Sequence, residues 1–346
     1  MQQQHEITSR HALLDSAGKL IEPGYTKGLL MDYDRKAIKG GALRIKEWDY
    51  YLIHAGNFAV ALTIADNSYM GLDSISLLDF TGVPWEHTNS PMAFMTMGKR
   101  NFPSGSDSGS VESGNGKYHI KFAHNGDHRL LTFHMDNFKD GNPIRGEIRL
   151  ENPEQESMVI CTPYKEKETA FYYNQKINCM PASGWVEYGG KTYTLPEGGA
   201  WGTLDWGRGV WTYKNTWYWG SASWIVDGVP FGWNIGYGFG DTSAASENML
   251  FYGGKAHKLS QVTFNIPMKD GTEDYMSPWT FTSDDGRFEM DFRPYLDRAS
   301  CTDVKIICSD QHQVFGLFTG KAVLDDGTVI QVKDLPGFAE KVMNKW

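Results

Sequence analysis

Short runs of alternating apolar and polar residues fill most of the chain, and turn sequences separate them. "GRFEMDF" and "GTVIQV" are two such runs, and each begins at the glycine of an Asp-Gly pair. A period of two is typical of strands with one buried face, and a tight turn between two such runs predicts a β-hairpin. The turn pairs are Asn125-Gly126, Gly189-Gly190, Asp227-Gly228, Gly253-Gly254, Asp285-Gly286 and Asp326-Gly327. The pattern therefore predicts an all-β protein of the sandwich or barrel type.

Helical periodicity is weak along the whole chain, and "PGFAEKVMNKW" at residues 336–346 is the best candidate for a short helix. A chain of 346 residues is long enough for one large or two medium domains. The passage "MPASGWVEYGG" is rich in residues that interrupt strands, and it predicts a boundary near residue 185. We therefore expect an N-terminal domain over residues 1–185 and a C-terminal domain over residues 186–346.

The stretch 202–224 is rich in tryptophan and leads into a predicted hairpin. If Asp227-Gly228 is a two-residue turn, Val226 pairs with Val229 and the remaining pairs follow from geometry. One face then collects the apolar pairs Trp224–Phe231, Ala222–Trp233, Gly220–Ile235 and Tyr218–Tyr237. The opposite face carries the pairs Ser223–Gly232, Ser221–Asn234, Trp219–Gly236 and Trp217–Gly238.

Two indoles that stand over glycines on this second face suggest free space beside hydroxyl and amide groups. A small-molecule site requires such space, bordered by aromatic rings and a few polar groups. The structural alternative is that the glycines relieve strand coiling at a barrel corner, while the indoles fill the interior.

Asp205 lies just before the predicted hairpin, in "GTLDWGRGVW". If it lines the same cavity among Trp201, Trp206 and Trp217, burial favours its protonated form, which could serve as a general acid. Arg208 would oppose this through an ion pair, although strand alternation alone places the two residues on opposite faces. An Asp205–Arg208 ion pair that fastens a bend is the structural alternative.

Polar residues between aromatic ones in "FYYNQK" (171–176) and in "GDTSAASENMLFYGGK" (240–255) could converge on this cavity, although each could equally cap a loop. The candidate catalytic residues are Asp205, Arg208 and Glu247. The candidate substrate-binding residues are Trp201, Trp206, Tyr213, Trp217, Trp219, Asn234, Tyr172, Tyr173, Asn174, Lys176, Asp241 and Asn248.

The formal net charge is -9, and no stretch concentrates Lys and Arg, so we expect no nucleic-acid partner. The N-terminus lacks a basic segment followed by an apolar one, and nowhere do 18 apolar residues run together. The four cysteines include no C-x-x-C pair, which favours reduced thiols over a disulfide framework. These features predict a cytoplasmic protein without a membrane span.

Three motifs have the wrong context for the chemistry that they resemble. "GSDSG" (105–109) matches a nucleophile elbow but sits in a Ser/Gly-rich loop without the strand and helix that give the motif meaning. "GYGFGD" lacks a surrounding βαβ unit, so we expect no nicotinamide or flavin cofactor. His124 and His128 flank a turn without a third metal ligand at a convincing spacing, so we also expect no metal.

The segments "LDWGRGVWTYKNTWYWGSAS", "NIGYGFGDTSAASENMLFYGGKAHKL", "AFYYNQK", "GKLIEPGY" and "KEWDYYLI" together resemble domain-of-unknown-function family 2804. That family is similar, more distantly, to carotenoid 1,2-hydratase and the AttH-like proteins. The resemblance implies two lipocalin-like β-barrels in tandem. It also implies that Asp205 matches an aspartate that protonates a double bond, although the relatives usually have Asp-His-x-Trp-Gly where this chain has Asp-Trp-Gly-Arg.

Three functions are compatible with these residues. The first is a cofactor-independent hydratase, hydrolase or isomerase, in which Asp205 donates a proton and the indoles stabilise a cationic transition state. The second is a glycoside hydrolase that pairs Asp205 with Glu247 or Asp241. The third is a binding protein without turnover. Each predicts a small-molecule ligand of isoprenoid, lipid or glycoside type, and the sequence does not predict the oligomeric state.

Overall fold

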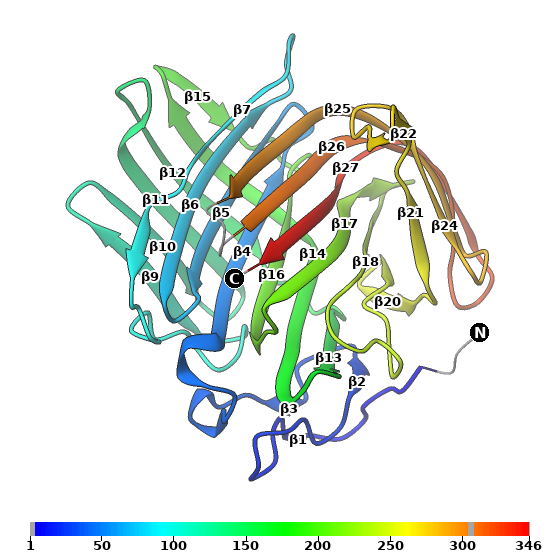
Figure 1. Cartoon of the computed structure of the whole chain (residues 1–346). Coiled ribbons are helices and arrows are strands. Elements are labelled where there is room, and N and C mark those ends of the chain that lie inside the picture. Colours follow the sequence, from blue (N-terminus) through cyan, green and yellow to red (C-terminus); the bar gives the residue numbers. More distant parts are fainter. Residues whose placement is uncertain (1–3, 304–307, 346) are drawn as a thin grey trace.

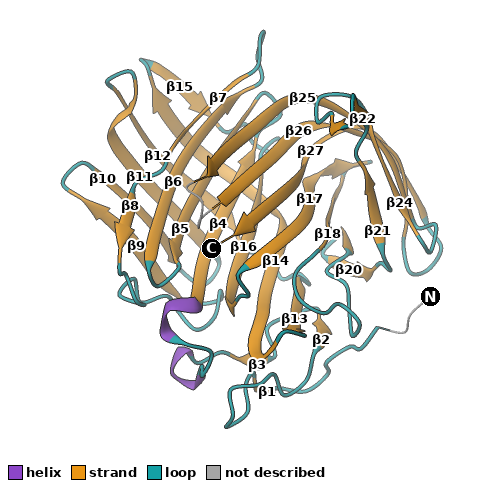
Figure 2. Ribbon diagram, viewed as in Figure 1, coloured by secondary structure: helices purple, strands orange, loops and turns teal. Residues whose placement is uncertain are grey.

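Two large curled β-sheets form most of the protein in the computed structural model, which describes residues 4–303 and 308–345. Figures 1 and 2 show the sheets side by side, with the chain passing from the first to the second. Two single-turn 3-10 helices, η1 (Arg35–Ala37) and η2 (Ala42–Arg44), precede the first long strand. The all-β, lipocalin-like prediction is confirmed.

The first sheet has the order β7-β6-β5-β4-β16-β14-β12-β11-β10-β9, with β2, β8, β13 and β15 paired at its margins. Its strands are β2 (Gly24–Thr26), β4 (Ile45–His54), β5 (Phe58–Asp66), β6 (Met70–Asp79), β7 (Trp85–Asn89), β8 (Met92–Phe94), β9 (Gly109–Asn115), β10 (Tyr118–His124), β11 (His128–Lys139), β12 (Asn142–Glu151), β13 (Met158–Tyr164), β14 (Lys167–Tyr188), β15 (Lys191–Thr194) and β16 (Trp201–Val210).

The second sheet has the order β20-β19-β18-β17-β27-β26-β25-β24-β21. Its strands are β17 (Lys214–Val226), β18 (Val229–Tyr237), β19 (Met249–Tyr252), β20 (Lys255–Lys258), β21 (Val262–Asn265), β24 (Trp279–Ser283), β25 (Phe288–Asp303), β26 (Cys308–Val323) and β27 (Val329–Lys345). Two small pairs complete the description: β1 (His11–Ala12) with β3 (Met31–Asp32), and β22 (Met268–Lys269) with β23 (Thr272–Glu273).

The C-terminal helix prediction is wrong, because residues 336–345 belong to β27. This strand pairs with β17 on one side and with β26 on the other, so backbone hydrogen bonds to two neighbours override the local preference of Ala, Glu, Lys and Met for helix. Residue 346 lies outside the described part of the chain.

The chain passes from the first sheet to the second between β16 and β17, at residues 211–213. Residue 185 lies inside β14, which continues across the first sheet to Tyr188. The motif "LDWGRGVWTYKNTWYWGSAS" therefore spans the junction: its first half forms a central strand of the first sheet and its second half a central strand of the second.

Each sheet has its own hydrophobic core, and a smaller cluster lies between the sheets. Leu52, Trp219, Phe315 and Phe338 belong to this third cluster, and all are buried. β14 and β16 contact β17 and β18 along the same junction.

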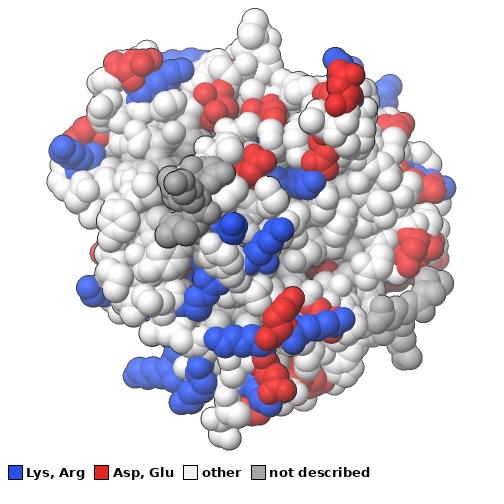
Figure 3. Space-filling model, in the orientation of Figure 1, with Lys and Arg blue, Asp and Glu red and all other residues white. Residues whose placement is uncertain are grey.

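On the surface, acidic and basic side chains are interspersed over the face that Figure 3 shows. Within the described residues, no helix has the length and apolar character needed to span a membrane.

Candidate functional site

The hairpin of β17 and β18 has the predicted register. Every pair from Val226–Val229 to Tyr218–Tyr237 is present, with the turn at Asp227-Gly228. Asp227 and Gly228 both have positive φ, at 51° and 80°, as this type of turn requires. The apolar face packs into the core of the second sheet, as its composition predicts.

The polar face of the hairpin meets the first sheet. A register shift in β14 between Ile177 and Met180 turns Asn178 toward β17. The Asn178 amide donates to Ser221 Oγ at 2.8 Å and to Ser223 Oγ at 3.2 Å, and Ser223 Oγ lies 2.9 Å from Thr203 Oγ1. These bonds join the two sheets in a buried polar layer.

Asp205 lies on β16 at this junction, and it faces Lys176 of β14 and Tyr50 of β4 in the register of the sheet. Lys176 Nζ lies 2.8 Å from Asp205 Oδ1, and the Asn174 amide donates to the same oxygen at 2.6 Å. The side chains of Lys176 and Asp205 are only 3% and 12% exposed. The Lys176 ammonium also lies 3.9 Å from the ring centre of Trp219, as a cation–π contact.

Two further buried carboxyl groups, those of Glu247 and Glu340, interact electrostatically with this ion pair. Burial raises the pKa of Glu247 to about 7, and the Asp205 carboxylate adds to the rise while Lys176 opposes it. Burial likewise raises the pKa of Glu340 to about 7, against the hydrogen bond from Trp217 and the charge of Lys176. Both groups can therefore exchange a proton near neutral pH.

Glu340 is a functional candidate that the sequence reasoning missed, because it lay in the segment predicted as a helix. Trp217 Nε1 donates to Glu340 Oε1 at 3.0 Å, and the Gln313 amide donates to Oε2 at 3.0 Å. Phe338, Glu340, Val342 and Asn344 alternate on one buried side of β27, but two of the four are polar, so the sequence carries no period-two signal for a strand here.

The indoles of the hairpin have polar partners. Trp219 Nε1 donates to Asn234 Oδ1 at 2.6 Å, and the Asn234 amide donates to the main-chain oxygen of Glu247 at 2.8 Å. Side chains occupy the space that the hairpin glycines leave. A Cβ at Gly236 would lie 3.1 Å from Glu247 Cδ, and one at Gly232 would lie 2.9 Å from Cys179 Sγ. Of the two glycines that the indoles were predicted to face, the space over Gly236 is thus filled, and a Cβ at the other, Gly238, would lie 2.8 Å from Trp217 Cα.

A small cavity of about 10 Å³ remains beside this layer, enough for one water molecule. It is lined by Leu52, His54, Trp201, Thr203, Ser221, Ala222, Ser223, Pro336, Gly337 and Phe338. Of the predicted residues, Trp201 lies here, two positions before Thr203 on β16.

Gly207 explains part of the "DWGRG" motif. A Cβ at this position would lie 1.9 Å from Trp48 Cζ2, so the indole of Trp48 rests directly on the glycine. The Trp48 ring stacks with Tyr172, with ring centres 6.2 Å apart, and Tyr172 stacks on Phe239 at 4.3 Å. The centres of the Trp217 and Phe239 rings lie 4.8 Å apart, so a row of contacting rings runs from Trp48 to Trp217, which bonds Glu340. The rings at the two ends of this row are half-buried.

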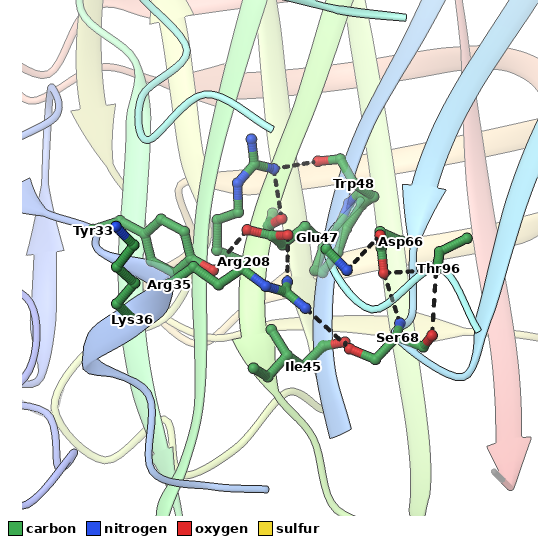
Figure 4. A network of polar contacts seen from close by, with 12 residues as sticks. Tyr33, Arg35, Lys36, Ile45, Glu47, Trp48, Asp66, Ser68, Thr96 and Arg208 are labelled. Atoms are coloured by element: carbon green, nitrogen blue, oxygen red, sulfur yellow. Dashed lines mark hydrogen bonds and ion pairs between the residues drawn. The ribbon is translucent and has the colours of Figure 1, made fainter. Parts of the chain in front are cut away.

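Three predicted site residues lie on the opposite face of β14 and β16. Arg208 is fully buried and pairs with Asp49, with Nη1 3.0 Å from Oδ1. The structural alternative of an Asp205–Arg208 ion pair is therefore wrong, because Asp205 pairs with Lys176. Strand alternation explains this, because positions three apart point to opposite faces. Trp206 lies 4.1 Å from the Arg208 guanidinium, and the Tyr173 hydroxyl donates to the main-chain oxygen of Met31. Figure 4 shows Arg208 beside the network of Glu47.

The remaining candidates lie away from Asp205 or hold loops. Asp241 caps a loop by accepting from the Ser243 amide at 3.0 Å, and Lys165 lies 3.5 Å from it. Asn248 fastens the hairpin, because its Oδ1 accepts from the Gly236 amide at 2.7 Å. Tyr213 is 47% exposed. Among residues 4–303 and 308–345, no group of three or more His, Cys, Asp or Glu side chains is placed to hold a metal ion.

Comparison with known proteins gives a family and two structural neighbours. The model of the family described as a domain of unknown function, DUF2804, matches residues 4–346. A protein of the AttH type from Nitrosomonas europaea superposes with a TM-score of 0.55 at 11% identity, covering 91% of this chain and 96% of its own. Kievitone hydratase from Nectria haematococca gives a TM-score of 0.50 at 10% identity, covering 92% of this chain and 96% of its own. No curated protein sequence matches.

Proposed function

Because this chain belongs to the DUF2804 family and has the fold of a hydratase and of an AttH-type protein, we propose that it is a hydratase-type enzyme acting on a small molecule. No cofactor enters the proposed reaction. The four described cysteines are free thiols, which supports the expectation of a cytoplasmic protein.

The observation that carries the proposal is the buried group of Lys176, Asp205, Glu247 and Glu340. Three buried carboxyl groups and one buried ammonium interact electrostatically, and two of the carboxyls have a pKa of about 7. Buried charge of this density is costly, and groups with such perturbed pKa values cluster at catalytic sites. A merely structural junction between two sheets needs none of it.

In the proposed reaction, Glu247 or Glu340 donates its proton to one carbon of a double bond, leaving a carbocation at the other carbon. The ring face of Trp217 and the Asp205 carboxylate stabilise this cation, the ring at about 0.5 to 2 kcal/mol. A water molecule then adds to the cation, and the proton that it loses returns to the carboxylate. Lys176 and Asn174 hold the Asp205 carboxylate in place. Asp205 thus acts as an electrostatic stabiliser here, and one of the two glutamates carries the proton.

The test is incubation with fractionated isoprenoid, lipid and oligosaccharide extracts in oxygen-18 water, read by mass spectrometry. The parent protein is compared with Glu247→Gln, Glu340→Gln and Asp205→Asn, and the exposed Glu154→Gln is the control for loss of a carboxylate. We expect label in a product with the parent and the control, and at least about 100-fold less with the variant of the glutamate that carries the proton, as for loss of an acid–base group. Equal labelling by all five proteins would overturn the assignment.

A binding protein without turnover is the second candidate, and the closed Lys176–Asp205 ion pair favours it, since a satisfied pair can serve packing alone. It predicts a compound that co-purifies equally with the parent and with Asp205→Asn, without label.

A glycoside hydrolase would need a pair of carboxyls. Asp241 is engaged with Lys165 and a loop amide, so Glu247 is the better partner for Asp205 in that reaction.

A further inference from the structure

A second polar cluster lies in the first sheet, on the face of β4, β14 and β16 opposite to Asp205. Arg208 of β16 and Arg129 of β11 are 0% and 4% exposed. Both guanidinium groups act on the Asp49 carboxyl, and Arg208 bonds it directly at 3.0 Å. Arg129 Nη1 also lies 3.4 Å from the Tyr51 hydroxyl. Two buried arginines therefore share one nearby carboxyl group.

The loop between β8 and β9, residues 95–108, covers this cluster and supplies one main-chain acceptor to each arginine, while Arg208 Nη1 also donates to the main-chain oxygens of Trp48 and Gly207. The main-chain oxygen of Pro103 accepts from Arg208 Nη2 at 3.2 Å, and that of Ser106 accepts from Arg129 Nη1 at 2.6 Å. The ring of Phe102 lies over the Arg208 guanidinium, with its centre 4.7 Å from Cζ. The Ser106 hydroxyl donates to Gln175, which is also buried. We call residues 95–108 the plug.

The charges under the plug do not balance. Arg208 and Arg129 face Asp49, whereas the neighbouring Glu47 is already paired with Arg35 and accepts from the Tyr33 hydroxyl, as Figure 4 shows. The Nε atom of each of these two buried arginines, Arg129 and Arg208, is itself buried and has no hydrogen-bond partner among the described residues. Two buried arginines thus have donor capacity that the chain does not use.

The plug is held in a strained backbone. Met95, Met97 and Asn101 have φ values of 55°, 51° and 52°, in the left-handed region that side chains other than glycine rarely adopt. The carboxylate of Asp66 holds this conformation, since it accepts from the Thr96 hydroxyl at 2.8 Å and from the Gly98 amide at 2.9 Å. Strain of this kind is concentrated at ligand clamps and switch segments, where the surrounding structure enforces it.

We propose that the plug occupies a ligand site, and that a small carboxylate bearing a ring displaces it and binds to Arg129 and Arg208. The carboxylate oxygens replace the main-chain oxygens of Ser106 and Pro103. The ring replaces that of Phe102 over the Arg208 guanidinium. This site is separate from the acidic cluster at Asp205 and does not depend on the function proposed for that cluster.

The chemistry of the two arginines selects this ligand. A carboxylate is planar, accepts two N–H donors side by side and carries the charge that the pocket lacks, whereas the carbonyl oxygens of the plug carry none. An aromatic ring stacks on a guanidinium plane as Phe102 does. We therefore expect benzoate to bind more tightly than acetate, and acetate more tightly than chloride.

The test uses the full chain with sodium benzoate, acetate, phosphate or chloride at matched ionic strength. Calorimetry gives the affinity, and hydrogen–deuterium exchange gives the protection of residues 95–108. Because the plug competes with the ligand, Ser106→Ala, which removes its bond to Gln175, should tighten benzoate binding about 2- to 10-fold. Ser104→Ala is the matched control, since this hydroxyl is exposed in the same loop. Arg129→Met should weaken binding at least about 10-fold, with Arg129→Lys as a second variant.

Benzoate binding that speeds exchange in residues 95–108, and that Ser106→Ala but not Ser104→Ala tightens, supports the proposal. Three outcomes overturn it. The first is no benzoate binding by the parent or by Ser106→Ala at 10 mM, a concentration on the order of that at which weak small-ligand sites saturate. The second is binding that persists in Arg129→Met and Arg129→Lys, which marks an adventitious additive only. The third is phosphate binding at the plug without benzoate binding.

Discussion

Replacing Glu340 with glutamine removes one of the two buried acids while preserving the shape of the side chain. The folded protein holds this carboxyl between the Trp217 indole and the Gln313 amide, with the residue 4% exposed. A neutral glutamine imitates the protonated acid but cannot ionise. The variant therefore separates the effect of proton binding from that of packing.

The magnitude follows from the rise of the pKa of Glu340 from 4.5 to about 7 on folding. Between these values the unfolded chain releases the proton and the folded chain keeps it, so the free energy of unfolding falls as the pH rises. Each pH unit is worth about 1.4 kcal/mol, so Glu340 alone removes about 3 kcal/mol of stability between pH 4.5 and pH 7. The stabilising contribution is complete below pH 4.5 and absent above pH 7.

Urea unfolding of the parent and of Glu340→Gln between pH 4 and pH 8 measures this difference. We expect the stability of the variant relative to the parent to rise by about 3 kcal/mol across the interval, because only the parent loses the contribution of Glu340 there. Glu247 contributes to both curves and cancels. Glu154→Gln, at an exposed position, is the control for the loss of one carboxylate. Parallel curves for Glu340→Gln and the parent would refute a buried protonated acid at this position.

Two further substitutions test the strand that carries both clusters. Gly207→Ala should cost about 3 kcal/mol or more in free energy of unfolding, since its Cβ would lie 1.9 Å from the Trp48 ring. Gly28→Ala is the control, because a Cβ at that position would have no atom within 4 Å. Equal stability of the two variants in urea would contradict this reasoning. Arg208→Met should cost about 3 to 5 kcal/mol in free energy of unfolding, because it removes the hydrogen-bonded partner of the buried Asp49 and leaves only the charge of Arg129. A loss below about 1 kcal/mol would show that Asp49 is protonated or solvated.

The sequence was most informative where the geometry is local. A two-residue turn at Asp227-Gly228 determines the register of β17 and β18, and the separation of apolar and polar faces follows from the pairs. The placement of Asp205 and Arg208 on opposite faces also follows from alternation within one strand. These inferences need no knowledge of the partner sheet.

Long-range pairing could not be predicted in the same way. Residues 336–345 have helix-favouring side chains, and only the arrival of β17 and β26 on either side makes them a central strand. Glu340 therefore remained hidden, and the approach of Lys176 to Asp205 depends on the pairing of β14 with β16. Filling of the space over Gly236 by Glu247 likewise depends on a loop whose path no local pattern specifies.

The central position of β27 has a consequence for the folding rate. Its pairs with β17, such as Ser221 with Phe338, join positions separated by seven other strands of the same sheet and by the small β22–β23 pair. Contacts of this sequence separation carry a large loop-closure cost and correlate with slow folding. Before β27 docks, β17 and β26 each present an open edge, which is a template for pairing with another chain. During synthesis, these edges stay unpaired until β27 has been made, so aggregation at this stage would compete with completion of the site.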